Sequence, residues 1–141
     1  MYHILIISHG GLAEAYRETI RMISGETDGI GAVGIMGGES KQDFALRLER
    51  EVKRLLTPDG LLIAADLFGG TPCNLVIAEI LARYGGIRAV SGVNLPMVLE
   101  ALTHQHGSLS KAVEAVMEAG HGGIRDINLE AASLIVNSED E

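Results

Sequence analysis

The alternation of short apolar runs with longer segments of helical period is the feature that most constrains this fold. The apolar runs have the length of strands and cover residues 4–7, 31–36, 61–65 and 87–90. Between them, apolar residues recur every three or four positions, as on one face of an amphipathic helix. The third run is apolar at every position, which is typical of a strand covered on both faces. This order predicts an α/β fold, with an open, doubly wound, mostly parallel sheet and helices on both sides.

Capping residues predict where the helices begin. Ser40, with Asp43 three positions later, is a short form of the capping box and predicts the start of the second helix. Thr71 followed by Pro72 predicts an N-cap and a first helical residue, with this helix running to about residue 84. Two later helices are expected to begin at Asn94 and Ser108.

The last part of the chain is the least regular. Residues 125–129 carry a weak strand pattern, residues 131–136 are ambiguous, and a tail at about 137–141 is expected to be disordered. The sequence contains no linker, internal repeat or low-complexity stretch. We therefore expect a single domain over residues 1–141.

Composition narrows the classes of partner and the cellular compartment. The 141 residues carry a formal net charge of −8, which argues against non-specific binding to nucleic acid or to an anionic membrane. This charge is compatible with positively charged protein partners, or simply with solubility. Cys73 is the single cysteine, which excludes a disulfide framework and makes a reduced cytoplasm the simplest location. The apolar N-terminus lacks a basic segment and is too short to span a bilayer.

The residues that follow the predicted strands are the candidates for function. Ligands of open α/β sheets bind beyond the carboxyl ends of the strands, where the strand order reverses. The corresponding segments are rich in Gly, Ser, Thr or Asn and cover residues 8–11, 37–40, 66–72 and 91–94. If the first and third strands are neighbours, His9 and Asp66 face each other across this point.

A His–Asp pair in this place has a definite chemistry. A carboxylate that accepts a hydrogen bond from Nδ1–H fixes the tautomer and leaves Nε2 free to take a proton, bind a metal or attack phosphorus. The N–H groups of the nearby glycines and of Thr71 could then hold phosphoryl oxygens. Alternatively, His9 is a capping residue and Asp66 is a turn residue at a strand end. The five histidines show no metal-ligand spacing, so we expect no metal site.

Three longer stretches make a resemblance specific. In this order and spacing, HILIISHGGLAEA, GLLIAADLFGGTPCN and VSGVNLPMVLEAL resemble the enzyme IIA domain of the mannose family (mannose, fructose and sorbose) of the bacterial sugar phosphotransferase system. The resemblance implies a flavodoxin-like three-layer sandwich with strand order 2-1-3-4. It also implies a last antiparallel strand that is exchanged between the subunits of a homodimer, for which residues 125–129 are the candidate.

The resemblance further implies a phosphotransferase that carries a phosphoryl group on a histidine. His9 would accept the group from the phosphohistidine of the carrier protein HPr and pass it to a IIB protein, which phosphorylates sugar during import by the membrane components IIC and IID. Asp66 would orient His9. No cofactor is expected. The surrounding phosphoryl-binding positions would be Ser8, Gly10, Phe68, Gly69, Gly70, Thr71 and Asn94.

Three other functions use parts of the same pattern. The chain ends soon after the IIA-like region, so a IIB partner must be a separate protein, and without one the protein would be a regulatory phosphoryl acceptor. The phosphoryl-donor subunit of a dihydroxyacetone kinase shares the histidine loop, but the Phe-Gly-Gly-Thr-Pro stretch at 68–72 argues against it. A flavodoxin-like module that binds a small molecule is disfavoured by the 4% aromatic content, which leaves little to stack on a flavin.

Overall fold

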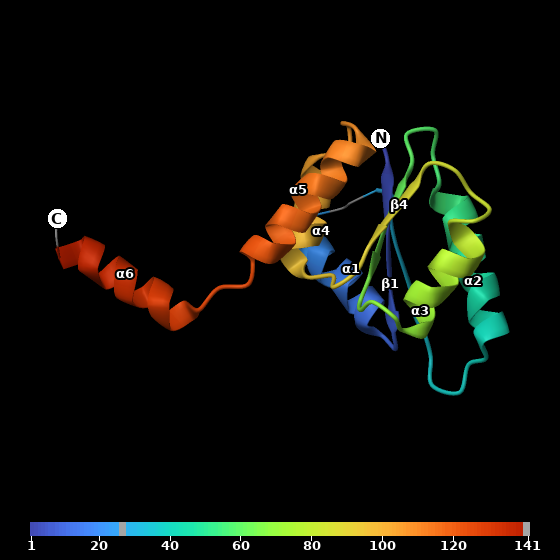
Figure 1. Ribbon diagram of the computed structural model, residues 1–141, viewed down its shortest axis with the longest axis horizontal. Coiled ribbons are helices and arrows are strands. Elements are labelled where there is room, and N and C mark those ends of the chain that lie inside the picture. The colour runs from blue at the N-terminus through green and yellow to red at the C-terminus, as the bar shows by residue number, and fades with distance from the viewer. Residues whose placement is uncertain (26–27, 140–141) are drawn as a thin grey trace.

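Four parallel strands form the centre of the computed structural model, which describes residues 1–25 and 28–139 (Figure 1). The strands lie in the order β2-β1-β3-β4, as the resemblance implied. Ser8 pairs with Gly34 of β2 and Ile7 pairs with Ala65 of β3, so the end of β1 has a neighbour on each side. The strands are β1 His3–His9, β2 Ile30–Ile35, β3 Leu61–Ala65 and β4 Ile87–Val90.

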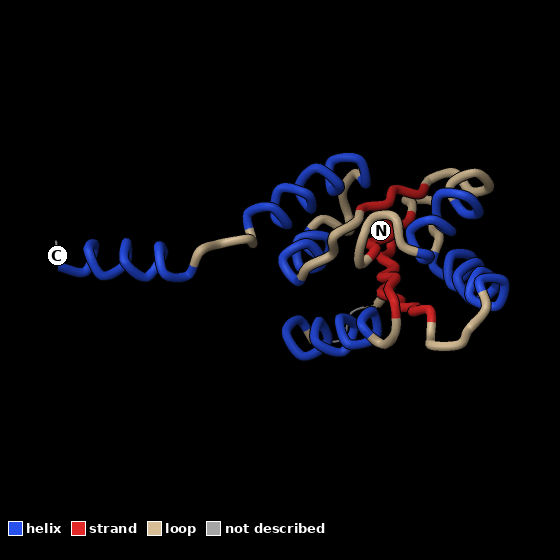
Figure 2. The backbone as a smooth tube through the Cα atoms, turned by 60° about the horizontal axis from the view of Figure 1, so that its bottom comes forward, coloured by secondary structure: helices blue, strands red, loops and turns tan. Residues whose placement is uncertain are grey.

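Helices cover both faces of this sheet and complete three layers (Figures 1 and 2). One face packs against α1 (Leu12–Ser24), α4 (Leu95–Thr103) and α5 (Leu109–Gly122). The other face packs against α2 (Lys41–Leu55), α3 (Thr71–Leu75) and the π-helix η1 (Val76–Ile80). The predicted α/β fold with a parallel sheet is therefore confirmed.

The central strand β1 is buried on both faces because successive side chains point to opposite layers. Ile4 and Ile6 pack toward α1, α4 and α5, whereas Leu5 and Ile7 pack toward α2 and η1. Each of these four side chains is at most 1% exposed. This double burial fixes the end of β1, where His9 lies, at the carboxyl edge of the sheet.

The helix after β3 differs from the one predicted. Gly70, and not Thr71, is the N-cap, and the regular helix is only the short α3. The chain then forms the wider turn of η1, in which the N–H of Leu81 donates to the carbonyl of Val76 at 2.9 Å. The extra residue in this turn rotates the side chains that follow, which a prediction from regular helical period does not detect.

The antiparallel strand expected at residues 125–129 is not formed in this chain. Its place is taken by α6 (Ile127–Glu139), which extends away from the sheet and its helices (Figures 1 and 2). A strand without a neighbour leaves its backbone polar groups unpaired, whereas a helix pairs them within the segment. Asp126 also accepts a hydrogen bond from the N–H of Leu129 at 3.1 Å, which caps the first turn.

The tail expected at about 137–141 overlaps the end of α6, which reaches Glu139. Residues 140–141 lie outside the described residues. Within the described part of the chain, no helix is both long enough and apolar enough to cross a membrane.

Candidate active site

His9 and Asp66 meet at the carboxyl edge of the sheet, at the ends of β1 and β3. Because Ile7 pairs with Ala65, the residues that follow the two strands face each other. Asp66 Oδ2 lies 2.8 Å from Nδ1 of the His9 ring and 2.9 Å from the backbone nitrogen of His9. Its Oδ1 accepts a hydrogen bond from the N–H of Leu67 at 2.8 Å. The structure therefore brings together the two residues that the sequence singled out.

Hydrogen bonds hold Asp66 in its ionised form. The side chain is 8% exposed, and burial by itself raises the pKa of the carboxyl group. The hydrogen bonds from the His9 backbone, the His9 ring and the Leu67 backbone outweigh burial and hold the pKa below its usual value of 3.8. At neutral pH Asp66 is a carboxylate and can only accept hydrogen bonds.

The ionised Asp66 fixes the tautomer of His9. The hydrogen between Nδ1 and Oδ2 must come from the ring, so Nδ1 is protonated and, in the neutral ring, Nε2 carries the free lone pair. The His9 side chain is 48% exposed, so a reagent can reach the ring from solvent. A neutral imidazole with an accessible lone pair is a nucleophile that needs no further deprotonation.

Ser8 is buried beneath this loop and supports the backbone. Its side chain is fully covered, and its Oγ accepts a hydrogen bond from the N–H of Ala13 at 2.8 Å. This bond ties the first turn of α1 to the end of β1. The expected contact between Ser8 and a phosphoryl group finds no support in this placement, because the hydroxyl is covered and already bonded.

The turn that follows His9 packs against β2 through two glycines. Gly10 has a φ of 58°, a left-handed conformation that favours glycine, and its N–H donates to the carbonyl of Ile35 at 2.7 Å. A Cβ atom at Gly34 would lie 1.9 Å from the carbonyl oxygen of Gly10. Gly34 was not among the predicted site residues, although a glycine inside a strand is a signal of close backbone approach.

The loop between β3 and α3 contains three of the predicted site positions, Phe68, Gly69 and Gly70, and the fourth, Thr71, is the first residue of α3. Gly70 lies so close to His9 that a Cβ atom there would be 2.6 Å from the ring carbon Cε1. Gly69 has a φ of 87°, and its carbonyl accepts a hydrogen bond from Nδ2 of Asn74 at 3.1 Å. Asn74, which the sequence did not single out, therefore fastens the loop to α3.

Asn94 joins two helices. Its Oδ1 accepts a hydrogen bond from the N–H of Met97 at 3.0 Å, which caps α4. Its Nδ2 donates to the carbonyl of Gly120 in α5 at 3.0 Å. Among the described residues it forms no hydrogen bond with His9 or Asp66. These bonds hold the side chain in place and use one of the two hydrogens on Nδ2.

An ion pair fixes the loop after β2, beside the turn that follows His9. Arg47 of α2 binds Glu39 through two bonds of 2.8 Å and donates to the carbonyl of Gly34 at 2.6 Å. Glu39 also accepts a hydrogen bond from the N–H of Met36 at 3.1 Å. The hydrogen bonds from Arg47 lower the pKa of Glu39 to about 2, so the pair stays charged at neutral pH. No sequence period signals this pair, because its partners are separated by a loop and the start of a helix.

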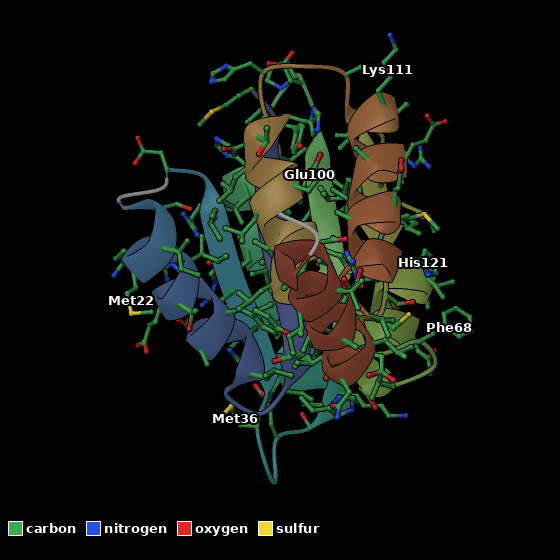
Figure 3. All side chains as sticks on the ribbon, turned by 90° about the vertical axis from the view of Figure 1, so that its left-hand side faces the viewer. Met22, Met36, Phe68, Glu100, Lys111 and His121 are labelled. Atoms are coloured by element: carbon green, nitrogen blue, oxygen red, sulfur yellow. The ribbon has the colours of Figure 1, made fainter. Side chains whose placement is uncertain are left out.

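Large apolar side chains are exposed on the loops around His9. They come from the start of α1 and from the loops after β2 and β3, and Figure 3 labels two of them, Met36 and Phe68. Exposed apolar side chains beside a nucleophile are available to pack against another protein. We call this set the apolar collar; its members and their exposed fractions are Leu12 47%, Met36 53%, Leu67 48% and Phe68 77%.

The chain is similar to known components of one transport system. A family model described as "PTS system fructose IIA component" matches residues 3–119. The PTS system sorbose-specific EIIA component of Klebsiella pneumoniae is 37% identical over 106 residues, which cover 75% of this chain and 76% of that protein. The PTS system mannose-specific EIIAB component of Escherichia coli (strain K12) is 28% identical over 124 residues, which cover 86% of this chain but 38% of that protein.

A solved structure shares most of the architecture. The crystal structure of phosphotransferase system component EIIA from Streptococcus agalactiae matches with a TM-score of 0.82 and 28% sequence identity. The match covers 92% of this chain and 99% of that chain. The likeness therefore extends over nearly the whole of this chain.

Proposed function

We propose, because the chain belongs to the mannose family of IIA components of the sugar phosphotransferase system, that Nε2 of His9 is the atom that carries the phosphoryl group. Members of this family are phosphotransferases, and the protein is a phosphoryl carrier in sugar uptake. In our proposal the donor is phospho-HPr and the acceptor is a IIB protein. The membrane components IIC and IID then import the sugar that IIB phosphorylates.

The His9–Asp66 pair is the observation that carries the proposal. The lone pair of Nε2 attacks phosphorus in line with the N–P bond of the donor's phosphohistidine. The new N–P bond forms as the old one breaks, and the electron pair of the broken bond returns to the donor's imidazole. The proton on Nδ1 stays between the ring and Asp66, whose negative charge offsets the positive charge that the ring acquires.

Weak binding of the phosphoryl group suits a carrier that must release it. The segments 8–13, 36–40 and 66–74 contain neither Lys nor Arg. We propose that the backbone N–H groups of Gly69, Gly70 and Thr71 face the phosphoryl oxygens. The N–H of Gly10 is already bonded to β2, so Gly10 shapes the turn instead. Any cation that approaches the phosphoryl group would then come from the partner protein.

The apolar collar supports two successive partners at one site. Donor and acceptor must each bring a histidine to Nε2 of His9, so both must cover the loops that surround it. Apolar contacts there do not depend on charge. They would therefore hold either partner whether or not His9 carries a phosphoryl group. The exposed Phe68 is the member of the collar that offers the most surface to such a partner.

We also propose a homodimer in which the C-terminal segment of each copy docks on the other. A groove of about 580 Å³ lies beside the edge strand β4, between η1 and α5, and side chains such as Ile77, Leu81 and Met117 line it. Ile124, where the C-terminal segment begins, also lines this groove. The expected antiparallel strand would form there against β4, whose outer edge pairs with no strand in the described part of the chain. The segment exposes Ile124, Ile127, Leu129, Leu134, Ile135 and Val136.

The alternative functions are not favoured, because the similar proteins are sugar-specific phosphotransferase components. We place the reaction in the cytoplasm, where a reduced Cys73 is expected; this cysteine is free and buried in the structure. Which sugar is imported depends on partners outside this chain.

The transfer assay tests the proposal. Incubation with phosphoenolpyruvate, enzyme I and HPr should add one acid-labile phosphoryl group, which intact-mass spectrometry detects. His9→Gln should abolish the addition, whereas His106→Gln, a change at an exposed histidine on another loop, should leave it intact. A subsequent addition of the IIB protein from the same genome should remove the group. Full phosphorylation of the His9→Gln variant would overturn the assignment.

A further inference from the structure

We propose that Gly70 is a positioning residue for His9. Because position 70 has no side chain, the His9 ring has room to lie where Nδ1 meets Asp66 and Nε2 stays uncovered. The consequence for phosphoryl transfer rests on the proposed function. The seating itself is a property of the unphosphorylated protein and can be measured without a partner.

The contact between Gly70 and the His9 ring leaves no room for a side chain. A Cβ atom at Gly70 would lie 2.6 Å from Cε1 and 3.2 Å from Nε2 of His9. Carbon atoms in favourable contact lie about 3.5–4.0 Å apart, so even a methyl group would overlap the ring. It would also lie 3.0 Å from Cδ1 of Leu67, a flexible side chain that is half exposed and can turn away.

The backbone of Gly70 does not itself require glycine. Its φ of −79° and ψ of 169° are extended values that any residue can adopt. Its neighbour Gly69 differs, because a φ of 87° favours glycine whatever the surrounding space. The loop therefore holds one glycine for backbone conformation and one for the volume that the His9 ring occupies.

Helix capping accepts glycine at this position but does not require it. Gly70 is the N-cap of α3, where Ser, Asp and Asn bond the first free N–H groups through their side chains and glycine is accepted almost as well. Among the described residues, no side chain caps this helix. A capping side chain at position 70 would intrude on the ring, so the free volume there serves His9.

The ring is the part that would yield to a larger residue. The carbonyl of Gly70 accepts a hydrogen bond from the N–H of Asn74 at 2.9 Å, which holds the backbone in place. The His9 side chain is 48% exposed and can rotate toward solvent. A methyl group at position 70 would therefore push the ring outward and break its bond to Asp66, while the fold stays intact.

The test compares Gly70→Ala with a matched glycine change. Gly11→Ala is the control, because Gly11 has a φ of −84° and open space around its Cα. The ring nitrogen chemical shifts of His9 in the unphosphorylated, ¹⁵N-labelled protein report the tautomer. Wild type and Gly11→Ala should show protonated Nδ1 only. Gly70→Ala should show a mixture with protonated Nε2, the same thermal unfolding midpoint within a few degrees, and transfer slowed on the order of 100-fold.

The second variant separates the two contacts of the added methyl group. Gly70→Ala/Leu67→Ala removes the overlap with Leu67 and keeps the overlap with His9, so it should behave as Gly70→Ala. Recovery of the wild-type tautomer in the double variant would overturn the proposal, as would a wild-type tautomer or an unfolded protein in Gly70→Ala. If wild type accepts no phosphoryl group, the proposed function fails, and the tautomer comparison still decides the role of Gly70.

Discussion

Asp66 is the residue on which the chemistry of His9 depends most directly, since its oxygens hold the ring, the His9 backbone and the N–H of Leu67. In Asp66→Asn the charge is lost and the amide can present a donor to Nδ1, which favours the wrong tautomer. We expect transfer from phospho-HPr to slow on the order of 100-fold. Rapid-quench measurement of single transfers checks this. Asp43→Asn, at an exposed carboxylate of α2, should transfer at the wild-type rate; equal rates in both variants would remove Asp66 from the mechanism.

The same carboxylate makes folding stability depend on pH. Its pKa is lower in the folded than in the unfolded protein, so its contribution is fully present above about pH 3.8 and is lost as the pH falls through the folded pKa. In that interval the unfolded state binds more protons, so the stability decreases as the pH decreases. Urea unfolding at a series of acidic pH values should show a steeper loss for wild type than for Asp66→Asn. Parallel curves would contradict this role.

At the scale of residues, the sequence was sufficient to predict that His9 and Asp66 face each other. It was not sufficient to predict the contacts of the side chains around them. His9 and Asp66 followed from the rule that ligands bind at strand ends, which requires only the strand order. The roles of Ser8 and Asn94 did not follow, because the direction of a hydroxyl or an amide depends on packing. Both side chains are engaged in holding helices.

Among the elements, β2 is especially sensitive to added volume near the site. A Cβ atom at Gly34 would overlap the backbone of Gly10, which cannot move as a flexible side chain could. Gly34→Ala should destabilise the protein by about 1–3 kcal/mol. Gly37→Ala, in the loop after β2 where a Cβ atom meets nothing within 4 Å, should stay within about 0.5 kcal/mol of wild type. Equilibrium urea unfolding measures both, and equal effects would refute the close approach of the turn.

The strands of the sheet were predicted well, because each is visible as a local apolar pattern in the sequence. The strands of the sheet appear as apolar runs because β1 and β3 are buried on both faces. The turn of η1 was not predictable, since a single wide turn leaves the apolar pattern nearly unchanged. The C-terminal segment was harder still: in one chain it is the helix α6, and its expected strand needs a second chain as a neighbour.

At the scale of the whole molecule, the oligomeric state tests the proposed homodimer. Sedimentation at micromolar concentration should give a dimer. Ile127→Asp/Leu129→Asp should give a monomer, because two charges cannot be buried in the apolar groove. Met22→Asp is the control, since Met22 is 79% exposed on α1 and lies on the opposite side of the molecule from Phe68 and His121 (Figure 3). A monomeric wild type, or a dimeric double variant, would contradict the proposed exchange.

The position of phosphorus on the His9 ring tests the central claim most directly. The protein, labelled with ¹⁵N and phosphorylated through HPr, can be examined by ¹H–¹⁵N correlation and ³¹P spectra that identify the nitrogen bonded to phosphorus. The geometry predicts phosphorus on Nε2 of His9, with the proton retained on Nδ1 next to Asp66. Phosphorus on Nδ1, or on any other histidine, would contradict the account.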